Sequence, residues 1–131
     1  MKKLLIIIIS IYLAGCASPY ARSVAFGGYS ETQYKENVFE VMFDGNGFTS
    51  WERSTDLCLL RCAELCKKNG YKYFVIVDNS DVEVYDNEYY IGKPIASNTI
   101  RCLKEKPAYE DSFEAEVIIE SISTKYNINL K

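Results

Sequence analysis

The chain has 131 residues, of which 48% are hydrophobic and 14% aromatic, and this length suits one globular domain. It contains no histidine, which removes Ser-His-Asp and Cys-His catalytic arrangements and every histidine-containing zinc site. The net charge of −3, with no block of Lys or Arg, argues against nucleic acid as a partner. We therefore expect a non-enzymatic protein with no catalytic residues, no metal and no cofactor.

The N-terminus has the pattern of a secretory signal peptide. Lys2 and Lys3 precede an apolar run over residues 4–14, which ends in Leu-Ala-Gly followed by Cys16. This run is too short to span a bilayer, which needs roughly 20 apolar residues. The cut site resembles the bacterial lipobox, which implies that the Cys16 thiol takes a diacylglyceryl group and becomes the mature N-terminus. We predict a signal peptide over residues 1–15, with an uncleaved anchor and an ordinary Cys16 thiol as the alternative.

Lipidation of Cys16 predicts a place in the bacterial cell envelope. Ala17 follows the cysteine, where inner-membrane lipoproteins carry Asp, so the resemblance to that sorting rule implies the periplasmic face of the outer membrane. Loss of Lys2 and Lys3 with the signal peptide leaves 13 basic and 18 acidic side chains, a charge of −5. An acidic surface does not favour anionic headgroups, so we expect membrane contact through the lipid.

Residues 16–36 show no sustained hydrophobic period and are predicted to be the lipidated N-terminus and a flexible tether. About 20 flexible residues have a root-mean-square reach of roughly 25 Å. Residues 37–131 then form a single globular periplasmic domain.

The first predicted strand and helix come at the start of this domain. Residues 38–43 alternate, with Phe39, Val41 and Phe43 on one face, as in a half-buried strand. Thr49 and Glu52 fit a capping box that opens a helix ending near residue 69. The intervening Gly-Asn-Gly turn at residues 45–47 is explained by this cap, with an anion cradle as the less favoured alternative.

Two further strands and a helix complete the predicted order β-α-β-β-α. Residues 71–77 form a near-continuous apolar strand, typical of a central position, and residues 78–90 extend it as an exposed arm. Residues 95–104 form a third, antiparallel strand, and residues 111–125 an amphipathic helix. We predict an α+β fold: a small, mixed three-stranded sheet with two helices packed on it as a two-layer sandwich.

Four cysteines remain in the domain once Cys16 is lipidated. Cys58, Cys62 and Cys66 follow each other at intervals of four on the first helix, and Cys102 lies on the third strand. The helical row spans about 12 Å, too long for one metal ion. A disulfide between Cys62 and Cys102 is one interpretation, since exported domains fold in an oxidising compartment. Four buried thiols in the core are the other.

Tyrosines gather in the predicted arm, at Tyr85, Tyr89 and Tyr90. Tyr is enriched at protein interfaces, so these residues are candidates for contact with a partner. Acidic residues of the same arm match no calcium-loop spacing, and a solvated hairpin explains them.

Several motifs together resemble a family of small proteobacterial lipoproteins of unknown function. The matching segments cover most of the mature domain and comprise Gly28-Tyr29-Ser30, residues 43–50 with Glu52-Arg53, Leu59-Leu60-Arg61 with Ala63-Glu64-Leu65, and residues 70–74. The resemblance implies an address and a fold but no activity, and its pattern does not require cysteine at positions 58, 62 and 66.

These observations predict a lipid-anchored envelope protein with a structural, sensory or partner-binding accessory role. Its expected partner is an unidentified envelope protein or a cell-wall component. The alternative is a small-ligand or metal-binding module of the periplasm.

Overall fold

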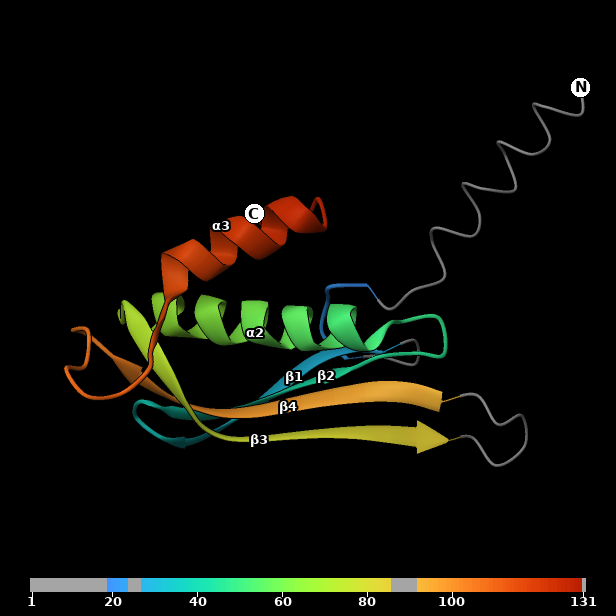
Figure 1. Ribbon diagram of the computed structural model, residues 1–131, viewed down its shortest axis with the longest axis horizontal. Helices are drawn as coiled ribbons and strands as arrows, with labels where there is room; N and C mark the ends of the chain where they lie inside the picture. The colour runs from blue at the N-terminus through green and yellow to red at the C-terminus, as the bar shows by residue number, and fades with distance from the viewer. Residues whose placement is uncertain (1–18, 24–26, 86–91, 131) are drawn as a thin grey trace, which may run out of the picture.

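A computed structural model describes residues 19–23, 27–85 and 92–130, without the side chains of residues 82–85. Five strands and two helices appear in the order β1, β2, α2, β3, β4, β5, α3 (Figure 1). Their bounds are β1 Gly28–Lys35, β2 Val38–Asp44, α2 Trp51–Lys68, β3 Tyr73–Tyr85, β4 Gly92–Leu103, β5 Phe113–Glu114 and α3 Ala115–Lys125.

The strands form one five-stranded sheet in the order β1-β2-β4-β3-β5, and every neighbouring pair is antiparallel. The predicted mixed, three-stranded sheet is therefore wrong, although the α+β class holds. The two additional strands arise where the sequence lacks apolar alternation: β1 lies in the predicted tether, and β5 has only two residues. Both lie at sheet edges, where a strand pairs with only one neighbour and does not need a strong apolar pattern.

The connection through α2 explains the second difference in the sheet. Strands β2 and β3, which flank α2, both pair antiparallel with β4, so they run in the same direction with β4 between them. This is a split β-α-β unit, in which the two strands that flank the helix run parallel but are separated by an antiparallel strand. The central strand is β4, not β3; beyond its contact with β5 at Tyr73 and Phe74, β3 has a free edge over its described residues.

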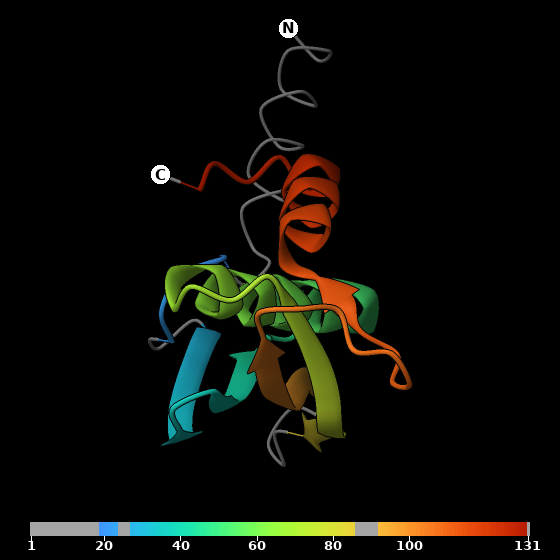
Figure 2. The same ribbon diagram turned by 90° about the vertical axis from the view of Figure 1, so that its left-hand side faces the viewer.

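The two helices form successive layers on one side of the sheet (Figures 1 and 2). Helix α2 packs on the face formed by β2 and β4, and α3 packs on α2 and β5. The predicted two-layer sandwich is thus also corrected, because only α2 covers the broad face of the sheet.

Local polar contacts set the start of α2. The Ser50 hydroxyl accepts a hydrogen bond from the backbone N–H of Arg53 at 3.1 Å, so Ser50 is the N-cap. Thr49, which we expected to cap the helix, instead hydrogen-bonds Asn46 of the preceding turn. The helix ends at Asn69 and Gly70, where the positive φ of Gly70 (82°) turns the chain towards β3.

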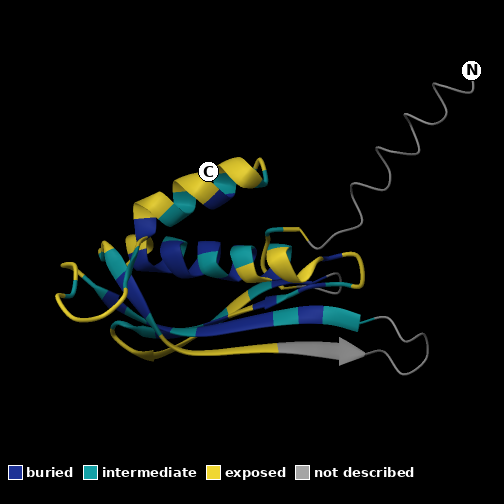
Figure 3. Cartoon of the chain, viewed as in Figure 1, coloured by how far each residue is buried: buried dark blue, intermediate teal, exposed yellow. Residues whose placement is uncertain are grey.

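The core lies between α2 and the sheet (Figure 3). The predicted alternation in β2 is confirmed, since Phe39, Val41 and Phe43 are at most 3% exposed and face the helix. Helix α2 contributes nine buried residues, while α3 buries only Ala115 and Ile122. The fold therefore depends mainly on the packing of α2, with α3 as an outer cover.

Candidate functional site

The segment that follows the predicted lipidation site is fastened to the domain. The backbone N–H of Ser23 donates to the Tyr29 carbonyl at 2.7 Å, and the Tyr29 N–H donates to the Ala21 carbonyl at 2.8 Å. Arg22 and Tyr29 form a parallel bridge, so residues 21–23 run beside the start of β1. The part of the predicted tether next to the domain is thus held by a short ladder of backbone hydrogen bonds, and residues 28–35 are strand β1 itself.

Gly28 allows this close approach. Its φ of +129° is a conformation that favours glycine, and a Cβ at this position would lie 2.3 Å from the Ala21 carbonyl oxygen. Any side chain would therefore push residues 21–23 away from β1.

Side chains from β1, α2 and the N-terminal segment meet in a partly buried ionic group that we call the Arg61 cluster (Tyr20, Tyr29, Glu31, Arg61 and Glu64). Arg61 binds Glu31 with two hydrogen bonds, Nη2 to Oε1 at 2.9 Å and Nε to Oε2 at 3.3 Å. Its Nη1 contacts Glu64 Oε2 at 3.3 Å, and its guanidinium lies 4.2 Å from the centre of the Tyr29 ring. A bidentate carboxylate and an aromatic face are the partners that suit a guanidinium.

Tyr20 connects the N-terminal segment to this cluster. Its hydroxyl donates to the Glu64 carboxylate, and its ring packs on Tyr29 with ring centres 5.1 Å apart. Glu64 thus accepts hydrogen bonds from both Tyr20 and Arg61, and a residue only four positions after Cys16 is bound to the middle of α2.

The electrostatics hold the cluster in one charge state. Burial alone would raise the pKa of Glu31, but the hydrogen bonds and charge of Arg61 lower it below its ordinary value. Burial opposes the charge of Arg61, yet Glu31 raises its pKa further. Burial, and then the hydrogen bond to Glu64, raise the pKa of Tyr20, so its hydroxyl stays protonated. Arg61 is thus paired with both Glu31 and Glu64, and with the hydrogen bond from Tyr20 these contacts fasten the N-terminal segment to the domain.

The described residues form neither a metal site nor a helix that could span a membrane. Within residues 19–23, 27–85 and 92–130, no group of three or more Cys, Asp or Glu side chains is placed to hold a metal ion. None of the helices in those ranges is both long and apolar enough to cross a bilayer.

A shallow cavity of about 400 Å³ lies where the end of α2 meets β3 and α3. Its lining mixes both charges, and the Lys67–Glu116 ion pair, 2.9 Å long, joins its two sides. The cavity walls are Lys67, Tyr71, Lys72, Tyr73 and residues 114–116. Since the two charged walls satisfy each other, this cavity does not select an anionic or a cationic ligand.

The turn before α2 uses several of its backbone donors within the protein, which disfavours an anion cradle there. The N–H groups of Gly45 and Thr49 donate to the Pro94 and Asn46 carbonyls, and the Phe48 N–H donates to the Asn46 side chain. With the Arg53 N–H donating to Ser50, these donors of the turn and of the first helical turn already have acceptors within the protein.

The predicted site residues fall into three groups. Cys62 and Cys102 both lie in the core and are free thiols in the structure, as are Cys58 and Cys66. Tyr85 is the last residue of β3, opposite Gly92, but its side chain lies outside the described part. Cys16, Tyr89 and Tyr90 lie outside the described residues altogether. Lipidation and partner contact therefore stay predictions.

Sequence reasoning missed the Arg61 cluster. The available signal was Arg61 itself, a charged residue between Cys58 and Cys62 on a helix face that is otherwise apolar. A buried Arg needs an acidic partner, but its chief partner, Glu31, is 30 residues away in a segment we predicted to be flexible.

No family model matches the chain, and neither a curated protein nor a solved structure shows significant similarity to it.

Proposed function

We propose that this protein is a lipid-anchored lipoprotein of the bacterial envelope, attached through Cys16, whose domain serves as a non-enzymatic accessory to another envelope component. The observation that carries the proposal is the signal at residues 1–16: a basic start, an eleven-residue apolar run and Leu-Ala-Gly-Cys in the right order. The absence of histidine favours a non-enzymatic role, and so does the use of the charged groups of the Arg61 cluster in contacts with one another.

The fastened N-terminal segment adds a restriction on position. Only Ala17 and Ser18 separate Cys16 from Pro19, so the α-carbons of Cys16 and Pro19 can be at most about 11 Å apart. With Tyr20 bound to Glu64, a lipid on Cys16 keeps the domain close to the bilayer surface. The sequence alone suggested a tether with more than twice this reach.

This position narrows the class of partner. A domain held at the bilayer surface can contact membrane proteins, other lipoproteins or wall components only where they approach the membrane. We propose the strand end at Tyr85, with Tyr89 and Tyr90, as the contact region, because tyrosine is enriched at protein interfaces.

The resemblance to small proteobacterial lipoproteins belongs to the same proposal. Four residues of the motifs that carry the resemblance, Gly28, Tyr29, Arg61 and Glu64, belong to the attachment of the N-terminal segment. Fastening this segment to the domain would then be a property of the whole group.

Metabolic labelling with an alkyne fatty acid tests the anchor. We expect the wild-type chain to incorporate the label and to fractionate with membranes. Cys16→Ser should lose the label and accumulate as an unprocessed precursor, whereas Cys102→Ser, a matched cysteine in the domain, should keep it. Equal labelling of wild type and Cys16→Ser contradicts the proposal.

Photo-crosslinking in cells tests the partner. A crosslinking amino acid at Tyr89 should capture one specific envelope component, identified by mass spectrometry. The same amino acid at Tyr109, which is fully exposed on the connection between β4 and β5, should not capture it. Capture from both positions, or from neither, contradicts the proposed contact region.

A further inference from the structure

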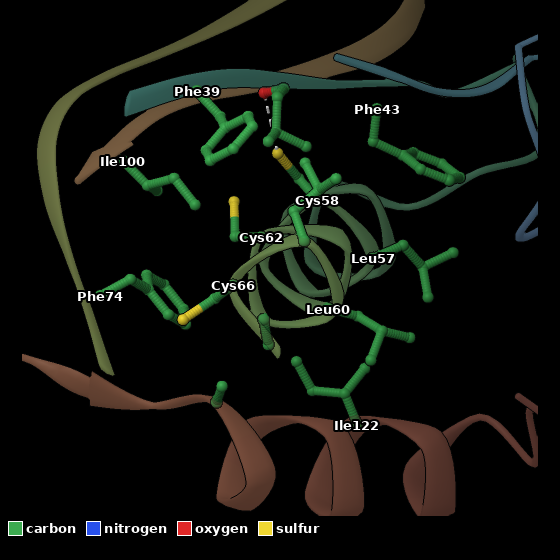
Figure 4. Close-up of a cluster of buried hydrophobic side chains, with 14 of the residues drawn as sticks. Phe39, Phe43, Leu57, Cys58, Leu60, Cys62, Cys66, Phe74, Ile100 and Ile122 are labelled. Carbon is green, nitrogen blue, oxygen red and sulfur yellow. Dashed lines mark hydrogen bonds between the residues drawn. The ribbon is translucent and has the colours of Figure 1, made fainter. Parts of the chain in front are cut away.

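Four cysteines lie in the core, and each is fully buried. Cys58, Cys62 and Cys66 point from successive turns of α2 towards the sheet (Figure 4), and Cys102 lies on β4. An exported chain folds where thiols are oxidised, so the geometry of this row decides which pair can be joined.

The first two cysteines of the row are poorly placed for a bond. The Cys58 Sγ lies 3.3 Å from the Val41 carbonyl oxygen and accepts a hydrogen bond from Asn98 Nδ2 at 3.4 Å. Cys62 hydrogen-bonds Cys58 along the helix, whereas Cys102 acts on the Cys62 thiol only through its charge. Positions four apart on a helix have Cβ atoms about 5–6 Å apart, beyond the 3.5–4.5 Å of a disulfide.

Cys66 lies at the end of the row, near the part of β3 that pairs with Cys102 of β4. Its Sγ is 3.2 Å from the Tyr73 carbonyl oxygen, and the next residue of β3, Phe74, is paired with Cys102. Two further backbone bonds close this corner, from the Tyr71 N–H to the Cys66 carbonyl at 3.0 Å and from the Lys72 N–H to the Leu103 carbonyl at 3.1 Å.

The two thiols also lie close enough to shift each other's pKa. Their mutual hydrogen bond is the largest influence on both, lowering the pKa of Cys66 and raising the pKa of Cys102, while burial raises each. We assign a neutral thiol to Cys66 in the folded protein, because a thiolate would face the Tyr73 carbonyl lone pairs at 3.2 Å. Cys102 thus has Cys66 as its thiol partner, whereas we had favoured Cys62 from the sequence.

We propose that Cys66 and Cys102 form a disulfide as the exported chain folds, and that Cys58 and Cys62 stay reduced. The inference rests on the proposed export through the Cys16 signal. Because both thiols are fully buried in the folded domain, the exchange must take place before the core closes.

The oxidant is a protein that carries a reactive disulfide. One cysteine attacks this disulfide as a thiolate and forms a mixed disulfide, and one sulfur of the oxidant leaves as a thiolate. The second cysteine, as a thiolate, then attacks the sulfur of the first; the bond to the oxidant breaks, its second sulfur leaves as a thiolate, and Cys66 is joined to Cys102. In total the chain loses two electrons and two protons, and the oxidant becomes a dithiol.

Peptide mapping of the full-length protein from the envelope tests this pairing. The denatured protein is alkylated without reduction and cleaved with trypsin, which leaves Cys62 and Cys66 together in residues 62–67 and Cys102 in residues 102–104. We expect these two peptides to be linked, with fragmentation placing the alkyl group on Cys62. Four alkylated cysteines, or a link through Cys58 or Cys62, overturn the proposal.

Two variants of equal burial make the test specific. Cys62→Ala should keep the linked pair, and reduction should then lower its melting temperature by more than about 10 °C, since the bond closes a loop between positions 36 apart. Cys66→Ala should show no link and no effect of reduction. Equal behaviour of the two variants contradicts the assignment.

Refolding separates this inference from the proposed function. The reduced, denatured full chain is refolded in a glutathione redox buffer, which requires no export. A Cys66–Cys102 link here but not in cells shows that the fold permits the bond but overturns its formation in the exported chain. A link in neither sample overturns the disulfide itself, while fatty-acid labelling at Cys16 still decides the anchor.

Discussion

Helix α2 has two flanks that hold different parts of the protein by different forces. The flank with Cys58, Cys62 and Cys66 is apolar and packs on the sheet without any exposed surface. The flank with Arg61 and Glu64 binds β1 and the N-terminal segment through ion pairs and hydrogen bonds. Apolar packing maintains the fold, whereas the directional contacts of the second flank can break while the fold remains. The connection to the proposed anchor is therefore the separable part of the molecule.

The largest expected effect comes from the apolar flank. Phe74 is fully buried beside the thiol pair and stacks on Phe113 at 5.3 Å, so Phe74→Ala should cost about 3–5 kcal/mol of unfolding free energy in urea. Val77→Ala, at a half-exposed position of the same strand, should cost less than about 0.5 kcal/mol. Under native conditions, the amides of Ser23 and Tyr29 should stay as protected from hydrogen exchange as in the wild type. Their release in Phe74→Ala would show that the two flanks are not separable.

Breaking the ionic flank at its centre should have a smaller effect. Arg61→Ala leaves Glu31, whose side chain is 14% exposed, without its main partner, and should cost about 2 kcal/mol. Lys67→Ala is the control on the same helix, since both partners of its ion pair with Glu116 are more than half exposed and such pairs contribute about 0–1 kcal/mol. Equal losses in urea unfolding would mean that burial gives the Arg61 pair no added strength.

Acid should weaken the contact between Glu31 and Arg61. Because the folded protein lowers the pKa of Glu31 below its ordinary value of 4.5, the pair contributes its full stability above about pH 4.5 and loses it as the pH falls through the lower folded value. The effect is smaller than that of Arg61→Ala, since protonation leaves Arg61 packed on Tyr29. Urea midpoints between pH 7 and pH 3 should fall less steeply in Glu31→Gln. If the urea midpoints of the wild type and Glu31→Gln fall in parallel with pH, protonation of Glu31 does not cause the loss of stability.

The smallest expected effect is local. Tyr20→Phe removes one hydrogen bond to Glu64, worth about 1 kcal/mol, and should speed exchange at the Ser23 amide with little change in the urea midpoint. Tyr109→Phe, at a fully exposed tyrosine, should change neither quantity. Unchanged exchange in Tyr20→Phe would show that the backbone ladder alone holds the segment.

The elements with a strong apolar pattern were predictable from the sequence. The alternation of Phe39, Val41 and Phe43, and the long apolar face of α2, place those residues in the core because burial of that face stabilises the fold. The end of α2 was also predicted to within a residue, since Gly70 gives a local signal.

What could not be predicted depends on contacts distant in sequence. Strand β1 is polar and lies at an edge of the sheet. The role of its Glu31 is apparent only from the contact with Arg61, which is 30 residues away in the sequence. The insertion of β4 between β2 and β3 has no local signature, because each strand pairs equally well with several neighbours. The choice of Cys66 over Cys62 required the register of Phe74 with Cys102.

The height of the domain above the membrane tests the central claim most directly. Neutron reflectometry on a supported bilayer carrying the lipidated protein should show the protein layer in contact with the headgroups, because residues 19–23 are fastened to the domain. A variant with about 20 Gly and Ser residues inserted between Ser18 and Pro19 should show a hydrated gap of roughly 25 Å. An equal gap in both proteins would contradict the account.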